Sequence, residues 1–437
     1  MSHIDYASSA FGFEPQVPRR PKPAWLPCPK PGEILAVIGP SGAGKSLALA
    51  ALAGPGRREI SRLRSEDLAT PVLDLFDPGR PSEEVLRTLA RVGLADGRLW
   101  GMDAGGLSAG ECRRLELALA IRGAKPGTLL IADEFDAHLD SVTARALAQN
   151  LRRIAARAQL RVAASTHRPE VLPQLAPDYL FEIDNGKARQ LPAPTPADLG
   201  DEIEIVPATV RDYDAFAHWH YLGPGRPGPT SEVWLARHHG RAVGIAMFGY
   251  PHLLLAARAT ALPEFAPARI RSDGAAGLNA SVRLLQRVVV DPRFRGIGVS
   301  ARLITHGLRH VGVPWVECIA QMGAFSEFLT GAGFERVCDM PPPRAARRLT
   351  EFCRMHGISA TALLDSAARA TLLAYLPQDA GRQLQRLLNR LVQSRIETGH
   401  GCLRGKPDAD HEPLLRRALA RLSAHPAYFL WTQKESP

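Results

Sequence analysis

An eight-residue run near the start of the chain has the spacing of a phosphate-binding loop. Residues 39–46 read GPSGAGKS and match the pattern G-x-x-x-x-G-K-[ST]. The glycines let backbone amides wrap an anion, and a following helix presents its positive N-terminal end. Lys45 is expected to reach the β- and γ-phosphates of a nucleotide, and Ser46 to ligate Mg²⁺. The predicted contacts are Gly39, Pro40, Ser41, Gly42, Ala43, Gly44, Lys45, Ser46 and Leu47.

Two adjacent carboxylates follow a second apolar run. Residues 129–132 read LLIA and are followed by Asp133 and Glu134. A carboxylate at the C-terminal edge of such a strand can hold Mg²⁺ directly or through water, which is the role expected of Asp133. Glu134 is expected to orient or deprotonate the attacking water as the catalytic base. Taken alone, the pair could equally be an acidic loop after a buried strand.

Further motifs follow in the order of one known family. Residues 107–111, LSAGE, resemble the signature motif of ABC ATPases, with Ala109 and Glu111 in place of the commoner Gly and Gln. Residues 137–140, AHLD, resemble the family's D-loop, and residues 165–167, STH, its switch histidine. With the glycine loop and the two carboxylates, the resemblance covers roughly residues 30–190. It implies an ATPase that binds ATP and Mg²⁺.

The same resemblance implies a homodimer in which two chains hold two ATP molecules head to tail. His167 would sense the γ-phosphate and help to order the water. The residues expected to contact ATP from the signature and D-loop motifs are Ser108, Gly110, Glu111 and Asp140.

The chain departs from the family pattern between the glycine loop and the signature. No glutamine occurs in residues 47–106, so the family's Q-loop residue is missing, and Asp74 or Asp77 is the candidate substitute. This stretch is also shorter than transporter cassettes usually have. Both departures favour an ATPase that does not serve transport.

A second anion-binding pattern lies further along the chain. Residues 287–298 read RVVVDPRFRGIG, a strand followed by a basic glycine turn and a helix start, which offer amides and arginines to a pyrophosphate. The R-x-x-G-x-G spacing resembles the acetyl-CoA motif of the GNAT superfamily of N-acetyltransferases, and the resemblance covers roughly residues 201–340. The acetyl-CoA contacts it implies are Val288, Val289, Val290, Arg293, Arg295, Gly296, Ile297, Gly298 and Val299.

The catalytic groups of this second site are less well defined by the sequence. Many members of the superfamily use a tyrosine as the acid, but residues 325–334 contain phenylalanines and Ser326 instead. Glu317, or His220 beside Tyr221, is a candidate base for the attacking amine. A domain that keeps the fold and only binds a ligand is the alternative.

The pattern of elements predicts two α/β domains. Strands are expected at residues 33–38, 129–132, 202–206, 284–290 and 313–319. Residues 232–237 and 242–250 are expected to form a hairpin that turns near His239 and Gly240. Helices are expected at 211–221, from about 298 to 310, and around 325–334. A closing strand at 427–431 would make the preceding helices an insertion in the second domain.

These elements give five predicted segments. They are a lead at 1–30, an ABC-type ATPase domain at 31–190, a Pro-rich linker at 191–200, a GNAT-like domain at 201–340 and a basic helical segment at 341–437. The last segment has 15 Lys and Arg against 8 Asp and Glu, and its arginines are a candidate surface for DNA or RNA.

Composition limits the remaining possibilities. The 437 residues have a net charge of +10, and six cysteines without a Cys-x-x-Cys pair suit a reducing cytoplasm. No apolar run is long enough to predict insertion in a membrane. The leading hypothesis is an ATPase fused to an acetyl-CoA-dependent N-acyltransferase, with ATP-driven dimerisation coupled to acyl transfer. The alternatives are a nucleic-acid-bound ATPase with a non-catalytic GNAT-like module and the cytosolic ATPase subunit of a transporter.

Overall fold

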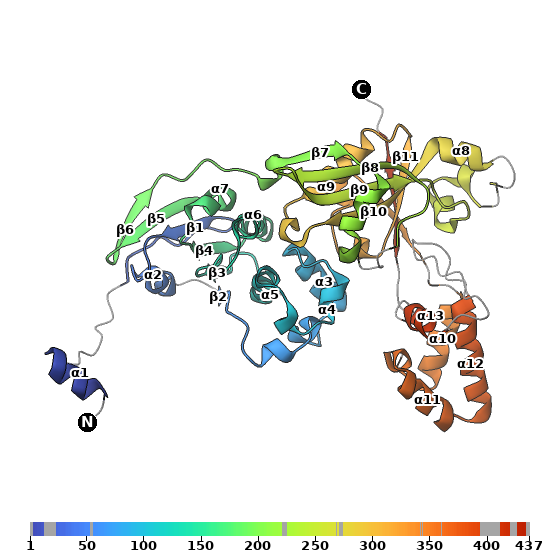
Figure 1. Cartoon of the computed structure of the whole chain (residues 1–437), viewed down its shortest axis with the longest axis horizontal. Helices are drawn as coiled ribbons and strands as arrows, with labels where there is room; N and C mark the ends of the chain where they lie inside the picture. The colour runs from blue at the N-terminus through green and yellow to red at the C-terminus, as the bar shows by residue number, and fades with distance from the viewer. Residues whose placement is uncertain are drawn as a thin grey trace. The chain divides into compact units, whose positions relative to one another are not determined.

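The computed structural model divides the chain into two compact units (Figure 1). Met1–Ser65 and Ser108–Asp198 form the first unit, and Glu66–Leu107 and Leu199–Pro437 form the second. The structure describes residues 3–12, 23–52, 56–220, 225–267, 269–270, 274–340, 342, 344–359, 361–393, 411–419 and 426–433.

The first unit is built on a six-stranded sheet in the order β2-β3-β4-β1-β5-β6. Its strands are parallel except for β6, which pairs with β5 in a hairpin. The apolar runs of β1 and β3 are buried except for Ile38, as expected of strands covered on both faces. The strands are β1 (Ile34–Ile38), β2 (Arg58–Glu59), β3 (Leu129–Ala132), β4 (Arg161–Ser165), β5 (Tyr179–Asp184) and β6 (Lys187–Leu191).

Two helices of the first unit begin at side chains that cap their free amides. Asp140 is the N-cap of α6 and accepts a hydrogen bond from the Thr143 amide at 3.1 Å. Ser108 is the N-cap of α5 and forms a capping box with Glu111. The helices are α1 (His3–Phe11), α2 (Lys45–Ala51), α5 (Ala109–Ile121), α6 (Ser141–Ala158) and α7 (Leu172–Leu175).

Residues 66–107 group with the second unit, although they lie between two ATPase motifs in the sequence. The predicted domain at 31–190 therefore does not coincide with a compact unit. A bridge between Pro71 and Asp103 closes the segment, and the Val72 amide donates to the Met102 carbonyl at 3.0 Å. Its helices are α3 (Ser82–Arg91) and α4 (Gly97–Trp100), with 3₁₀ turns at Asp67–Ala69, Val72–Leu75 and Ala104–Gly106.

A seven-stranded sheet in the order β12-β13-β11-β10-β9-β8-β7 forms the core of the second unit. Neighbouring strands are antiparallel except for the parallel pair β10 and β11. Helix α9 (Val299–Leu308) packs on β8 and β9, and α8 (Gly274–Ser281) precedes β10. The strands are β7 (Ile203–Pro207), β8 (Thr230–His238), β9 (Arg241–Gly249), β10 (Val282–Val290), β11 (Trp315–Ala320), β12 (Glu335–Asp339) and β13 (Ala427–Thr432).

The last strand lies inside this sheet, next to its edge strand, because β13 pairs with both β11 and β12. The helices between β12 and β13 are thus an insertion with a core of its own, which includes Leu349, Leu363, Leu384, Leu388 and Leu391. They are α10 (Arg344–Met355), α11 (Ser366–Tyr375), α12 (Gln378–Gln393) and α13 (His411–Leu419).

Two predicted helices are wrong. Residues 210–219 form the 3₁₀ turns Val210–Ala215 and Ala217–Trp219, and Tyr221 lies outside the described residues. Residues 322–332 form the short 3₁₀ turns Met322–Ala324 and Thr330–Ala332. Glycine explains the second case, because Gly323, Gly331 and Gly333 weaken helix formation and Gly333 has a φ of 92°.

No helix among the described residues combines the length and the apolarity that crossing a membrane requires.

Candidate functional site

The glycine loop between β1 and α2 has the backbone of a phosphate cradle. Gly39, Gly42 and Gly44 have φ angles of 141°, 78° and 100°, which L side chains rarely adopt. A Cβ at Gly39 would lie 2.1 Å from the Ile183 carbonyl oxygen, so only glycine fits there. The loop ends where α2 begins at Lys45, so free amides and a helix N-terminus lie together.

Lys45 is held against the loop that it is predicted to serve. Its Nζ donates to the carbonyl oxygens of Gly39 and Pro40, both at 2.9 Å, and lies 3.2 Å from Nδ1 of His167. Burial lowers the pKa of Lys45, while the charges of Glu134 and Asp133 oppose that shift. An incoming phosphate can replace these carbonyl contacts with stronger charge-assisted ones.

The C-terminal ends of β3 and β4 bring the remaining catalytic candidates together. His167 Nε2 lies 2.8 Å from Glu134 Oε1, and both side chains are partly exposed. Ser165 links the two strands, because its hydroxyl donates to Asp133 and accepts from the Glu134 amide at 2.8 Å. Lys45, Asp133, Glu134 and His167 thus form one continuous polar cluster at the carboxyl edge of the sheet.

The signature residues have local partners at the start of α5. Glu111 Oε2 accepts hydrogen bonds from the Ser108 amide at 2.9 Å and the Ser108 hydroxyl at 2.7 Å. A Cβ at Gly110 would lie 2.8 Å from Cγ2 of Thr143, so a side chain would disturb the contact with α6. Glu111 in this structure caps its own helix, as does Asp140 for α6, and their contacts to ATP remain predictions.

The basic glycine turn of the second unit follows β10 and precedes α9. Gly296 and Gly298 have φ angles of 85° and 89°, and Gly298 is the N-cap of α9. The turn therefore presents backbone amides beside a helix N-terminus, which is a fold suited to an anion. Ile297 and Val299 are buried and anchor it.

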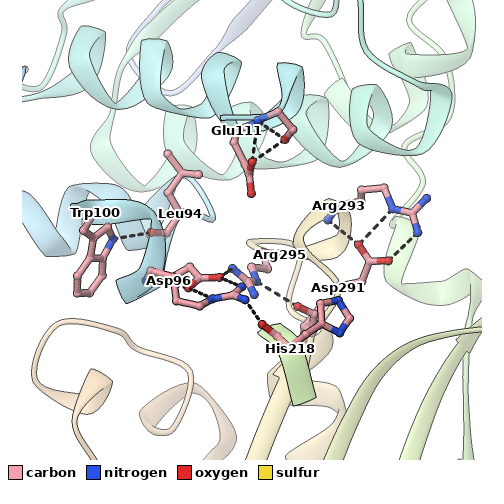
Figure 2. Close-up of polar contacts among 11 residues, drawn as sticks. Leu94, Asp96, Trp100, Glu111, His218, Asp291, Arg293 and Arg295 are labelled. Atoms are coloured by element: carbon pink, nitrogen blue, oxygen red, sulfur yellow. Dashed lines mark hydrogen bonds and ion pairs between the residues drawn. The ribbon is translucent and has the colours of Figure 1, made fainter. Parts of the chain in front are cut away.

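Both arginines of this turn are already paired with aspartates (Figure 2). Arg293 donates to Asp291 through Nε at 3.1 Å and Nη2 at 2.6 Å. Arg295 donates through Nη1 to Oδ2 of Asp96 at 2.8 Å and through Nε to the Val290 carbonyl at 3.1 Å. Asp96, in the segment 66–107, thus binds the Arg295 guanidinium that the sequence predicts to contact a pyrophosphate.

Asp96 is a buried polar centre that the sequence analysis missed. Its side chain is 2% exposed and also accepts from the Arg98 amide at 3.1 Å and from Arg98 Nη2 at 2.7 Å. Burial alone would raise its pKa, but the hydrogen bonds and charges of Arg98 and Arg295 outweigh it, and the pKa lies below the usual value. Nothing local distinguishes Asp96 from other acidic residues, because its partner Arg295 lies 199 positions away in the chain.

Two further contacts join the segment 66–107 to residues 199–437 of the same unit. Arg98 donates to the His218 carbonyl oxygen, and Trp100 meets Phe325 edge to face with ring centroids 5.7 Å apart. Helix α4, which Asp96 caps, therefore lies against the turn and the residues before β12.

The strands β10 and β11 stop pairing before this turn. Their parallel register runs from Val282 paired with Trp315 to Leu284 paired with Glu317 and ends there. Within these fully described strands, Val288, Val289 and Val290 pair only with β9. An extended molecule could therefore lie along β10 on the side that β11 has left.

The structure contradicts the prediction that Glu317 is a base. Glu317 and Arg258 are both 0% exposed, and the guanidinium binds the carboxylate through Nε at 2.9 Å and Nη2 at 2.7 Å. The Tyr428 hydroxyl also donates to Glu317 at 3.1 Å, and burial raises the pKa of Tyr428. A carboxylate that is fully buried and doubly held cannot reach an amine substrate.

His220 is a poor base in its present environment. Burial, and then the charges of Arg287 and Arg98, lower the pKa of His220 to about 3. The ring is neutral at pH 7 and can accept a hydrogen bond, but it retains an abstracted proton weakly.

The first unit is a P-loop nucleotide-binding α/β domain by its parallel sheet, its glycine loop and the carboxylates at the sheet edge. The chain is 30% identical over 204 residues to a thiamine import ATP-binding protein of Photobacterium profundum, a match over 39% of this chain and 82% of that protein. An aliphatic sulfonates import ATP-binding protein of Rhodococcus jostii is 32% identical over 38% of this chain and 74% of its own length. The chain belongs to the ABC family of ATPases through this part of its sequence.

A solved ATP-binding cassette of an ABC transporter, in its ADP conformation, is 17% identical over 36% of this chain and 79% of its own, with a TM-score of 0.32. No protein-family model matches the chain.

Proposed function

We propose that this protein hydrolyses ATP in its first unit and transfers an acyl group from coenzyme A to an amine in its second unit. One observation supports acyl transfer in the second unit. Strand β10 stops pairing with β11, and the turn that follows β10 has two glycines with left-handed φ and leads into the N-terminus of α9. A strand edge suits the amides of a pantetheine arm, and the turn suits its pyrophosphate.

In the ATPase half, the loop at residues 39–47 would cradle the phosphates, with Ser46 and Asp133 as the Mg²⁺ ligands. Bound Mg²⁺ would neutralise charge that develops on the phosphates. Glu134 would hold the attacking water, and its contact with His167 would fix the orientation of both side chains. Two chains would complete two such sites through Ser108 and Gly110.

In the acyltransferase half, the amine nitrogen would attack the thioester carbonyl carbon. The C–N bond forms, the C–S bond breaks, and the thiolate takes up a proton while the amine loses one. His220, as a neutral ring, would accept a hydrogen bond rather than hold a proton. Acetyl is the proposed acyl group and a macromolecule in the cytoplasm the proposed acceptor.

The Asp96–Arg295 ion pair supplies the proposed coupling between the two reactions. The pyrophosphate would compete with Asp96 for Arg295, so acyl-CoA would bind more tightly when the segment 66–107 is displaced. The chain enters this segment after the phosphate loop and leaves it directly before the signature, so ATP-driven changes in the first unit would act on it.

Calorimetry with acetyl-CoA tests the proposal directly. Gly296→Trp is expected to abolish binding, because the side chain would fill the turn. Gly312→Trp is a matched control, since Gly312 also has a left-handed φ of 63° but lies after α9, where the nearest atom to an added Cβ is the His310 carbonyl oxygen at 3.9 Å. Absence of acetyl-CoA binding by the unaltered protein, with and without ATP, would rule out the acyltransferase.

A transporter role is the second candidate, because the relatives named above are import ATP-binding proteins. It predicts a membrane protein that co-purifies with this chain. A nucleic-acid role has narrower support in the exposed Arg382, Arg386 and Arg390 of α12, and it predicts ATP hydrolysis stimulated by DNA or RNA and suppressed by salt.

A further inference from the structure

Two consecutive histidines and a glutamate converge at one corner of the second unit's sheet. His238 is the last residue of β8, and His239 begins the turn to β9. Glu202 ends the 3₁₀ turn Leu199–Glu202, directly before β7. Because β7 and β8 pair Ile203 with His238, the register places Glu202 beside the end of β8.

The three side chains present donor atoms to a common point. Nε2 of His238 lies 3.0 Å from Oε2 of Glu202, and Nε2 of His239 lies 3.5 Å from the same oxygen. All three donor atoms lie within 4.8 Å of one another. A tetrahedral zinc ion with N and O ligands at about 2.0–2.2 Å keeps neighbouring ligand atoms roughly 3.4 Å apart. The present spacing therefore already approximates a coordination shell.

A simple ion pair accounts for only part of this arrangement. His238 is 9% exposed and Glu202 is partly buried, so these two groups form a reasonable pair alone. The His239 side chain is 75% exposed, and an exposed ion pair contributes little to stability. The two rings are in contact, with centroids 4.2 Å apart, and a divalent cation can accept a lone pair from each imidazole and from the carboxylate together.

We infer that Glu202, His238 and His239 bind a divalent transition metal of the zinc class. Two imidazoles and a single carboxylate favour zinc, cobalt or nickel over the Mg²⁺ that serves a nucleotide. The exposed side of His239 leaves the remaining coordination positions to water.

The bound ion would fix the start of the sheet to the β8–β9 turn. Its effect would extend to the basic glycine turn, because the His238 ring contacts the Phe294 ring with centroids 5.1 Å apart. Phe294 lies between Arg293 and Arg295, so the metal would hold in place the backbone proposed to bind an anion. The metal site itself does not depend on acyl transfer.

Titration of the full-length protein, prepared without a histidine tag or nucleotide, with Co²⁺ and Zn²⁺ tests this inference. One equivalent of Co²⁺ is expected to give the visible absorption of a low-coordinate nitrogen and oxygen site, to be displaced by Zn²⁺, and to resist excess Mg²⁺. His239→Asn is the most informative variant, because an Asn-Gly turn suits the left-handed φ of 47° at this position and should preserve the hairpin.

His239→Asn and Glu202→Gln are each expected to weaken Co²⁺ binding by at least about tenfold, whereas His356→Asn, an exposed histidine in the helical insertion, should leave it unchanged. Failure to take up one equivalent would overturn the inference. So would equal affinity in His239→Asn, or a thiolate charge-transfer band, which would assign the ion to a cysteine.

Discussion

At the scale of single residues, the ATPase site depends on contacts between strand ends. Glu134 and His167 come from different strands, yet their side chains meet at 2.8 Å. Ser165 holds Asp133 in place between them. Because the Glu134 and His167 side chains are partly exposed, each can be changed without removing a core side chain, and binding and hydrolysis should be separable by mutation.

Glu134→Gln is expected to lower the rate of ATP hydrolysis by roughly 10²–10⁴-fold while leaving ATP binding intact, because the amide cannot act as a base. Lys45→Ala should weaken ATP binding itself. Single-turnover hydrolysis and nucleotide titration would distinguish the two effects. A Glu134→Gln variant that hydrolysed ATP at the normal rate would remove Glu134 from the base role.

His220 predicts a pH dependence of stability. The pKa of His220 falls from 6.5 to about 3 on folding, so the unfolded chain binds more protons between these values and folding stability is lost as pH falls through this window. At pH 5 the loss relative to pH 7 should be about 2 kcal/mol. His220→Gln should flatten this part of the urea-denaturation profile, and His356→Gln should not. Parallel profiles for all three proteins would contradict the assignment.

At the scale of elements, the helical insertion and the last strand make separate contributions. The insertion has a leucine core of its own, whereas β13 lies between β11 and β12 in the sheet. Damage to the insertion should therefore remain local, and damage to β13 should not.

Leu388→Ala, a buried position in α12, is expected to cost about 2–5 kcal/mol through the cavity it leaves. Hydrogen exchange should show the loss in α10–α13 and leave protection in β10 and β11 unchanged. The matched change at an exposed site of the same helix, Gln385→Ala, should have little effect. Loss of protection throughout the sheet would mean that the insertion is not an independent folding element.

At the scale of the whole molecule, the proposed coupling between ATP binding and acetyl-CoA binding can be measured from either side, because such coupling is reciprocal. If ATP changes acetyl-CoA affinity by some factor, acetyl-CoA must change ATP affinity by the same factor. Measuring both in a Glu134→Gln background removes hydrolysis from the comparison.

Asp96→Asn is expected to raise acetyl-CoA affinity, because it frees the Arg295 charge for the pyrophosphate, and to reduce the effect of ATP on that affinity. Asp379→Asn, on an exposed helix of the insertion, is the charge-matched control. If Asp96→Asn left both quantities unchanged while circular dichroism showed a folded protein, the ion pair would be structural only.

The sequence by itself determined the local chemistry of this protein. A glycine loop, a signature and a carboxylate pair in the family's order give the resemblance to ABC ATPases, because each motif is short and its chemistry follows from adjacent residues. The hairpin that turns at His239 and Gly240 was predictable for the same reason, since alternating apolar residues and a glycine specify it locally.

Only the tertiary structure decided which distant groups meet. Glu317 was a candidate base from the sequence, but Arg258, 59 positions away, binds it in the core. Residues 66–107 looked like part of the ATPase domain, but they pack with the second unit through Asp96. Side-chain partners of high sequence separation leave no local pattern, because burial and charge pairing are set by the folded chain as a whole.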